Sequence, residues 1–306
     1  MNNVDLKKIG TENRNPNTMN IDKVSTREVL VLINNEDKTV PYAVEKEIEH
    51  IAALVDCIVE QFKKGGRLIY VGAGTSGRIG LIDAVECRPT YSCSDEMVQC
   101  LMAGGMKAMV KAVEGAEDSK EMAVEQLKEI NLAKNDVVIG IAASGRTPYA
   151  IGAVEYAKSI GCKTGSISTS MNSEIGKVVD FPIEAVTGAE PITGSTRMKS
   201  GTAQKLICNM ISTASMIKMG KVYGNLMIDV QPTNQKLVKR AQNILTQAVG
   251  ISNEEAQVYI DKYHSVKKAL FAILSGIENL EEIDAILDRN YGNIRDALKE
   301  VGVAND

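Results

Sequence analysis

The sequence predicts a doubly wound α/β fold, a parallel β-sheet with helices on both faces, followed by a small C-terminal helical bundle. Short continuous apolar runs such as RLIYVG and DVVIGI end in glycine-containing loops, a pattern typical of buried strands. Stretches with helical spacing alternate with these runs, and such an alternation builds a parallel sheet that is covered on both faces. With 306 residues, the chain is long enough for one large α/β domain with an appendage.

Two helices are expected before the first strand. The first 20 or so residues show no helical or strand period, and then Ser25 and Glu28 match a capping box, so a short helix begins there. After Pro41, apolar residues from Val44 to Phe62 recur at helical spacing, and the run stops at a glycine pair. This pattern predicts one long amphipathic helix.

The strand and helix signals then repeat along the chain. The first expected strand, 67–72, leads through a loop into a helix that ends near Val85. The second, at 97–105, leads into a helix over 107–130, and the third, at 136–145, leads into a helix over 146–161. The fourth, at 163–170, is followed by a further short apolar run at 178–185. A long helix is expected within 193–220, as a candidate for packing against a partner subunit. The segment 221–234 is too rich in glycine and proline punctuation to be helical throughout.

From about Lys239 the chain is helical again, with three short amphipathic pieces at 251–260, 265–274 and 293–302. We therefore expect two domains. Residues 1–238 are expected to form the α/β domain with its N-terminal helices, and residues 239–306 a helical, UBA-like domain.

The composition excludes several classes of function. A net charge of -4 with scattered basic residues gives no electrostatic footprint for nucleic acid. No apolar run approaches the roughly 18 residues that a membrane span needs, and the polar start does not resemble a secretion signal. No two of the six cysteines are separated by two residues, which favours reduced thiols and a cytoplasmic protein. The sequence has only two histidines, which disfavours a histidine metal site or a Ser/His/Asp triad. We therefore expect no metal or cofactor, and we expect carboxylates to carry out any acid–base chemistry.

The first glycine loop, Gly72 to Arg78, follows a strand and opens a helix, and its backbone N–H groups can therefore bind an anion. Its candidate ligand-binding residues are Gly74, Thr75, Ser76 and Gly77. The spacing also fits the G-x-G-x-x-G dinucleotide pattern, but the second strand ends in glycines without the acid that would hold a ribose. A monophosphate therefore fits better than NAD, and a tight turn that binds nothing is the alternative.

A second loop of the same kind follows the strand at 136–141. Its candidates are Ser144, Gly145, Arg146 and Thr147, with Pro148 placed for the first helical turn. Because ligands collect at the carboxyl ends of parallel strands, the two loops are expected to converge on one phosphate.

Two carboxylates are candidates for acid–base work. Glu86 is expected to end the helix after the first loop, and Glu117 follows the second strand. Two carboxylates in different environments can divide the acid and base roles, although a solvated surface position is the ordinary fate of any one Glu. Glu114 and Asp118 flank Glu117 and remain alternatives.

Hydroxyl-bearing and basic side chains are also concentrated over 193–205, at the start of the long helix. There Ser195 and Lys199 are candidates for binding an anionic ligand across a dimer interface. A capped helix start with small residues for close packing is an equal alternative.

The motifs GAGTSGR, AVEC, VEGAED, AASGRTP, TGSTRMKSGTAQK and GKVYGNLMIDV, in this order, resemble those of the N-acetylmuramic acid 6-phosphate etherase family within the sugar isomerase (SIS) superfamily. The likeness runs from about Thr11 to Asn234 and extends only loosely to the tail. It implies a SIS α/β domain, a homodimer with the site near the subunit interface, and release of D-lactate to leave N-acetylglucosamine 6-phosphate. By this resemblance Glu86 corresponds to the family's proton donor, and Glu117 to its second acid–base carboxylate.

The sequence departs from the family pattern in two places. It has Val85-Glu86-Cys87-Arg88-Pro89 where the family usually has Ser-Glu-Cys-Pro-Pro, and Thr169-Ser170-Met171 where the family has Cys-Asn-Pro. Both carboxylates are kept, so activity is expected. The open alternatives are an aldose–ketose phosphosugar isomerase and a phosphosugar-sensing regulator.

Overall fold

The computed structural model describes residues 12–111, 113–230 and 235–303. By its internal contacts the chain divides into two compact units. One unit is formed by the chain up to Val85 together with Asp95–Ser212, and the other by Glu86–Ser94 together with the chain from Thr213 onward. The boundary predicted from the sequence, between residues 238 and 239, falls inside helix α9 (Gln235–Val249).

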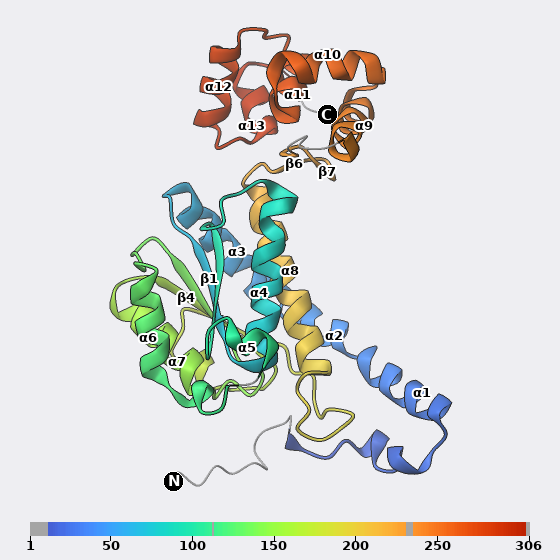
Figure 1. Ribbon diagram of the computed structural model, residues 1–306, viewed down its shortest axis with the longest axis vertical. Helices are drawn as coiled ribbons and strands as arrows, with labels where there is room; N and C mark the ends of the chain where they lie inside the picture. The colour runs from blue at the N-terminus through green and yellow to red at the C-terminus, as the bar shows by residue number, and fades with distance from the viewer. Residues whose placement is uncertain (1–11, 112, 231–234, 304–306) are drawn as a thin grey trace. The chain divides into compact units, whose positions relative to one another are not determined.

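The first unit contains a five-stranded parallel sheet in the order β2-β1-β3-β4-β5 (Figure 1). The strands are β1 (Leu68–Gly72), β2 (Val98–Met102), β3 (Val137–Ile141), β4 (Lys163–Ser168) and β5 (Phe181–Glu184). Every one of these lies in a segment where the sequence predicted a strand or short apolar run. The doubly wound α/β fold class is therefore confirmed.

Helices cover both faces of this sheet (Figure 1). On one face, α6 (Lys120–Glu129) and α7 (Pro148–Ser159) share a core with alternate strand residues such as Ile69, Val71 and Val138. This is the period of two that places successive strand side chains on opposite faces.

On the other face lie α3 (Ile48–Lys63), α4 (Gly74–Tyr91) and α8 (Lys199–Lys218). Here the hydroxyl of Tyr70, from β1, donates to Asp83 of α4 at 3.1 Å and to the carbonyl of Cys208 in α8 at 3.4 Å.

The segment before the sheet differs in part from its prediction. The capping box is confirmed at the start of α1 (Thr26–Asp37), where Ser25 and Glu28 bond reciprocally. Two 3₁₀ turns, η3 (Pro16–Thr18) and η4 (Ile21–Lys23), precede it.

The single long helix expected after Pro41 is wrong. The structure has α2 (Val40–Glu45) and then α3, with Glu47 between them at φ -100° and ψ 4°. A tertiary contact accompanies the break, because the Glu47 carboxylate accepts a hydrogen bond from the backbone N–H of Glu184, at 3.1 Å.

Two further helix predictions are corrected. α4 begins at Gly74, inside the predicted loop, and continues through Pro89 to Tyr91, so Glu86 lies within the helix and does not end it. The helix expected over 107–130 is broken into α5 (Lys107–Val110), the 3₁₀ turn η5 (Ala116–Asp118) and α6. Gly115 has φ +74°, a left-handed conformation that a continuous helix cannot contain.

The second unit is built on a helical core. Within 221–230, the described part of the segment predicted not to be helical throughout, two short strands form an antiparallel ribbon. The described residues that follow form five helices, where three were predicted. The elements are β6 (Val222–Tyr223), β7 (Leu226–Met227), α9, α10 (Asn253–Tyr263), α11 (Val266–Ser275), α12 (Leu280–Arg289) and α13 (Ile294–Glu300). Buried residues from all five helices, together with Ile228, form one hydrophobic cluster. Within the described residues, no helix is both long and apolar enough to cross a membrane.

A buried ion pair fastens the amino ends of β1 and β3. Asp136 is 1% exposed, and its carboxylate accepts hydrogen bonds from the Arg67 guanidinium at 2.6 and 3.1 Å. It also accepts from the backbone N–H groups of Arg67 and Ala133, at 2.9 and 2.8 Å. Removing Asp136 takes the acceptor from both backbone N–H groups and the counter-charge from Arg67, which is 20% exposed and keeps hydrogen bonds to the carbonyls of Ile130 and Asn131.

We expect Asp136→Ala to lower the free energy of unfolding by about 3–5 kcal/mol. The matched control is Glu155→Ala, which removes a pair with Lys120 that is 45% exposed on both sides and should cost at most about 1 kcal/mol. Urea unfolding followed by circular dichroism measures both. An equal loss of unfolding free energy in the two variants would show that the Arg67–Asp136 pair stabilises the sheet no more than an exposed pair does.

Candidate functional site

The loops after β1, β2 and β3 meet at one edge of the sheet. β1 pairs with β2 on one side and with β3 on the other, in register from Leu68 to Gly72. The strand order reverses between β1 and β3, and in open α/β sheets ligands bind at this switch point, outside the carboxyl ends of the strands. Both loops predicted to bind phosphate follow these two strands.

Two glycines shape the turn from β1 into α4. A Cβ on Gly77 would lie 2.6 Å from the carbonyl oxygen of Gly72 and 2.9 Å from Cγ of Met102. Gly74, the first helical residue, has φ +53°. The first turn of α4 therefore lies against the strand end, and the free N–H groups of that turn can bind an anion.

A cavity of about 340 Å³ opens beside this turn. It is bounded by the start of α4, the end of β2 and the segment that leads to η5. Its lining residues are Ala73, Gly74, Arg78, Met102, Ala103, Ala108, Val113, Glu114, Gly115, Ala116 and Glu117. The structure thus brings Glu117 and Gly74, two of the predicted site residues, to one cavity.

Arg78 and Glu114 complete the charged lining of this cavity. The Arg78 guanidinium donates to the carbonyl of Ala108 at 2.7 Å and to that of Met109 at 3.1 Å, so it ties α5 to the first turns of α4. Glu114 and Glu117 are both exposed. Arg78 stands in the GAGTSGR motif but was not among the predicted site residues, because the sequence does not show that α5 folds back to it.

The second loop takes the shape that its glycine permits. Gly145 has φ +68°, and a Cβ there would lie 2.3 Å from Cβ of Ser173. The Ser144 hydroxyl accepts a hydrogen bond from the N–H of Arg146 at 3.3 Å, and Arg146 lies 3.6 Å from the Glu174 carboxylate. Thr147 occupies the N-cap position of α7 without capping it through its side chain, and Pro148 stands in the first helical turn as predicted. These loop residues do not line the 340 Å³ cavity, and their convergence on one phosphate stays a prediction.

Ser76 and Lys199 point into the protein. Ser76 is 8% exposed, and its hydroxyl lies 3.0 Å from Oε1 of Gln204 in α8. Lys199 is 3% exposed, and its ammonium group donates to Glu36 at 2.7 Å and to the carbonyl of Ala189 at 3.1 Å. Lys199, the first residue of α8, is therefore paired with the buried Glu36 of α1. Ser195 precedes this helix and is half-buried, while Thr75 is half-buried in α4.

Glu86 belongs to the other compact unit. It lies in the fourth turn of α4 and is exposed, and its carbonyl accepts a hydrogen bond from the hydroxyl of Thr90 at 2.7 Å. The division of the chain between Val85 and Glu86 could not be foreseen from the sequence, which shows a continuous helical pattern there.

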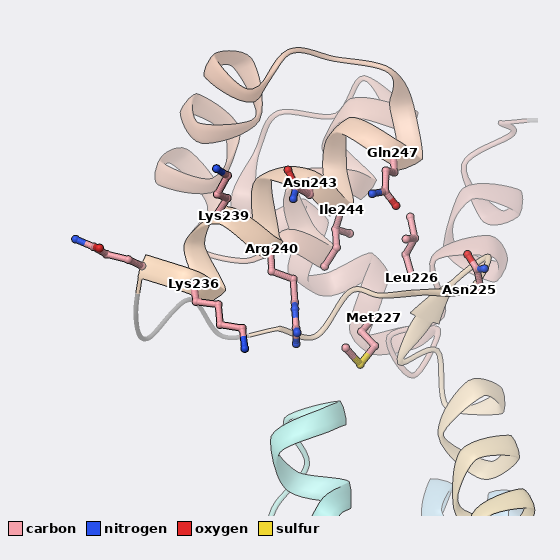
Figure 2. Close-up of a pocket in the computed structure, with 10 residues that line it drawn as sticks. Asn225, Leu226, Met227, Lys236, Lys239, Arg240, Asn243, Ile244 and Gln247 are labelled. Atoms are coloured by element: carbon pink, nitrogen blue, oxygen red, sulfur yellow. The ribbon is translucent and has the colours of Figure 1, made fainter.

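A second hollow, of about 680 Å³, lies in the C-terminal unit between the β6–β7 ribbon and α9 (Figure 2). Its lining residues are Asn225, Leu226, Met227, Gln235, Lys236, Lys239, Arg240, Asn243, Ile244 and Gln247. Figure 2 shows the side chains of Lys236 and Arg240 extending from α9 in the same direction. This lining includes three cations and no carboxylate, so it does not supply a pair of acid–base carboxylates, and it holds none of the predicted site residues, although Asn225, Leu226 and Met227 belong to the GKVYGNLMIDV motif.

Replacing Lys199 with Met tests the buried pair with Glu36. Burial raises the pKa of Glu36, but hydrogen bonds from Lys199, Asn17 and Asn15 outweigh it, and the net pKa is lowered. A lowered pKa contributes stability above the unfolded-state value, and this stability is lost as the pH falls through the folded-state value.

We therefore expect Lys199→Met to lower the free energy of unfolding by about 3–5 kcal/mol at neutral pH, and the deficit to shrink toward about pH 3. Urea unfolding at several pH values checks this. A variant with wild-type stability throughout would show that Lys199 has no structural role.

The comparisons with known proteins point to one family. A model described as the glucokinase regulatory protein N-terminal SIS domain matches residues 50–158. A protein of Clostridioides difficile (strain 630) named N-acetylmuramic acid 6-phosphate etherase is 53% identical over 297 residues, which is 97% of each chain. A protein of the same name from Clostridium botulinum (strain Hall) is 54% identical over 98% of this chain and 100% of its own length.

One solved structure that matches this chain is the phosphoheptose isomerase of Neisseria gonorrhoeae. It is 14% identical, with a TM-score of 0.48, and the match covers 62% of this chain and 98% of that one.

The curated relatives match more than half of the residues over nearly the full length of both chains. The chain belongs to the N-acetylmuramic acid 6-phosphate etherase family.

Proposed function

We propose that this protein cleaves the D-lactyl ether of N-acetylmuramic acid 6-phosphate, giving D-lactate and N-acetylglucosamine 6-phosphate. The observation that carries the proposal is the identity of 53% and 54% to relatives named for this activity, over 97% or more of each chain. The protein is thus a carbon–oxygen lyase of amino sugar breakdown and cell-wall recycling. A cytoplasmic location and a homodimer with the site near the subunit interface are parts of the same proposal.

The 6-phosphate is assigned to the switch-point edge of the sheet. The open first turn of α4, with Gly74 and Thr75, offers backbone N–H groups and a hydroxyl to a dianion. The N–H of Gly77 donates to the Ala73 carbonyl at 3.2 Å, so Gly77 contributes the close turn and not a donor. Ser144 and Thr147 follow the neighbouring strand β3 and are assigned to the same phosphate. Binding at this edge leaves the sugar to extend toward the acidic lining of the 340 Å³ cavity.

Ser76 contacts α8 from the same turn. Its partner Gln204 is 1% exposed, and Nε2 of Gln204 has no hydrogen-bond partner among the described residues. Exchanging the two ends of the amide lets Nε2 donate to the Ser76 hydroxyl oxygen but leaves Oε1 without that partner. Ser76 is therefore proposed for the phosphate only by its place in the loop, and its contact with Gln204 holds the first turn of α4 against α8.

The reaction that fits two carboxylates is elimination followed by hydration. In the open-chain sugar the C2 proton is α to the aldehyde, so a base can remove it, and the C3–O bond to lactate breaks as the C2–C3 double bond forms. Water then adds at C3 and a proton returns to C2, so the net change is the hydrolysis of one ether. Lactate is a poor leaving group unless it is protonated, which requires a positioned acid.

We assign the leaving-group proton to Glu86. Glu117, which lines the cavity beside the phosphate turn, assists at C2 or activates the water. Glu114 lines the same cavity and is the competing carboxylate for this second role. Asp118 follows Glu117 in η5 but does not line the cavity, which makes it a suitable control.

The first test is incubation of the purified protein with N-acetylmuramic acid 6-phosphate in a metal-chelating buffer. We expect stoichiometric D-lactate and N-acetylglucosamine 6-phosphate. An isomerised sugar phosphate without lactate would instead show an aldose–ketose isomerase. Tight binding without turnover would show a phosphosugar sensor.

The second test assigns the carboxylates. We expect Glu86→Gln and Glu117→Gln each to lower kcat by about 10²–10⁴-fold, the usual contribution of one general acid or base, because the amides cannot exchange a proton. Asp118→Asn should keep kcat within about twofold. Full turnover by Glu86→Gln contradicts its assignment, and a loss in Glu114→Gln larger than in Glu117→Gln moves the second role to Glu114.

A further inference from the structure

The segment that carries Glu86 is held by the C-terminal unit. Residues Glu86–Ser94 belong to the same compact unit as the five C-terminal helices, although their helix starts at the phosphate turn. The GKVYGNLMIDV motif, which begins at Gly220, has no part in the chemistry proposed above. One of its residues, Asp229, contacts the end of this segment.

Ser92 ends α4 in a strained conformation. It has φ +49°, which is uncommon for a residue other than glycine, and its N–H donates to the Arg88 carbonyl at 2.9 Å. Its hydroxyl donates a hydrogen bond to the backbone carbonyl of Asp229, in the motif. The last turn of the helix is thereby joined to residue 229.

Asp229 is in turn fixed by two lysines. Its carboxylate lies 2.8 Å from the ammonium of Lys221 and 2.8 and 3.0 Å from that of Lys267 in α11. The side chains of Asp229 and Lys267 are only 14% and 12% exposed. Burial lowers the pKa of Lys267 even though Asp229 opposes the shift. A carboxylate between two cations in partly buried surroundings forms strong, directional contacts.

The neighbouring motif residues pack directly on the helical core. A Cβ on Gly220 would lie 2.5 Å from Cα of Asn293, at the start of α13. Ile228, beside Asp229, is fully buried in the hydrophobic cluster of the helices. The motif is therefore anchored at both of its ends.

The hollow around this cluster does not suit a charged ligand. It has a volume of about 560 Å³ and its charged lining consists of three lysines and three aspartates, whose formal charges cancel: Lys221, Lys267, Lys268, Asp229, Asp284 and Asp288. Lys268 and Asp284 pair with each other at 2.6 Å. Five of these six charged groups thus pair with one another.

We infer that Ser92, Asp229 and Lys267 are positioning residues, which fix the carboxyl end of α4 and with it the direction of Glu86. This inference rests on the proposed function and extends it. Contacts within the C-terminal unit then support the helix turns that carry the proposed leaving-group acid.

The sharpest test is Ser92→Gly. Glycine adopts the left-handed φ without strain and keeps the backbone cap, but it removes the hydroxyl that reaches Asp229. We expect kcat for lactate release to fall on the order of tenfold, because a Glu86 that is held less firmly is displaced from the geometry that proton donation needs. KM should stay within about twofold and the melting temperature should not fall, since strain is relieved.

A second readout separates positioning from general damage. In D₂O, exchange of the C2 proton precedes departure of lactate, so Ser92→Gly should slow lactate release more than C2 deuteration. Asp229→Asn, which keeps the carbonyl but weakens both lysine contacts, should show the same split. Glu278→Gln is the control, because it breaks an exposed pair with Lys262 in the same unit and should leave kcat unchanged.

The outcomes distinguish this inference from the function on which it rests. A wild-type protein that releases no lactate overturns the proposed function. An active wild type with full kcat in both Ser92→Gly and Asp229→Asn overturns the positioning role. Should Ser92→Gly not fold, the kcat and exchange split in Asp229→Asn decides alone.

Discussion

The contact between Gly72 and Gly77 is the constraint on which the candidate site depends. Backbone lies against backbone there, and any side chain on Gly77 would meet the Gly72 carbonyl at 2.6 Å. This approach lets α4 begin directly at the end of β1, so that its unpaired N–H groups face the edge where β2 and β3 also end. A wider turn would move the anion-binding groups away from the acidic lining that follows β2.

Buried polar contacts hold α4 and α8 in the positions that this turn requires. Asp83 of α4 accepts hydrogen bonds from Asn209 at 2.6 Å and Ser212 at 3.0 Å, both in α8, and from Tyr70 of β1. Burial raises the pKa of Asp83, and these three donors only partly offset that effect. Such a group costs free energy to ionise, but its donors specify one arrangement of the two helices and the strand. With the Ser76–Gln204 contact, it sets the rotation of α4 about its axis.

The C-terminal helices gain a role from the division of α4 between the two units. Ser92, directly after the last turn of α4, donates to the backbone carbonyl of Asp229, whose carboxylate is held by Lys221 and Lys267. As inferred above, these contacts position the carboxyl end of α4. The C-terminal helices then contribute to the proposed reaction through this support, a role that the lack of readable motifs in their sequence does not reveal.

The sequence by itself determined the fold class, each strand of the parallel sheet, the Ser25 capping box and the two glycine loops, because these follow from local periodicity and from the conformations that only glycine and proline favour. It did not predict the β6–β7 ribbon. Only the tertiary structure decided where helices break and which side chains meet. Glu47 interrupts a good helical pattern where its carboxylate meets β5, and Arg78 reaches α5 across a turn that no spacing encodes. Lys199, read as a ligand group from its neighbours in sequence, pairs with Glu36, 163 residues away. Contacts of this kind depend on long-range packing, which a single sequence does not specify position by position.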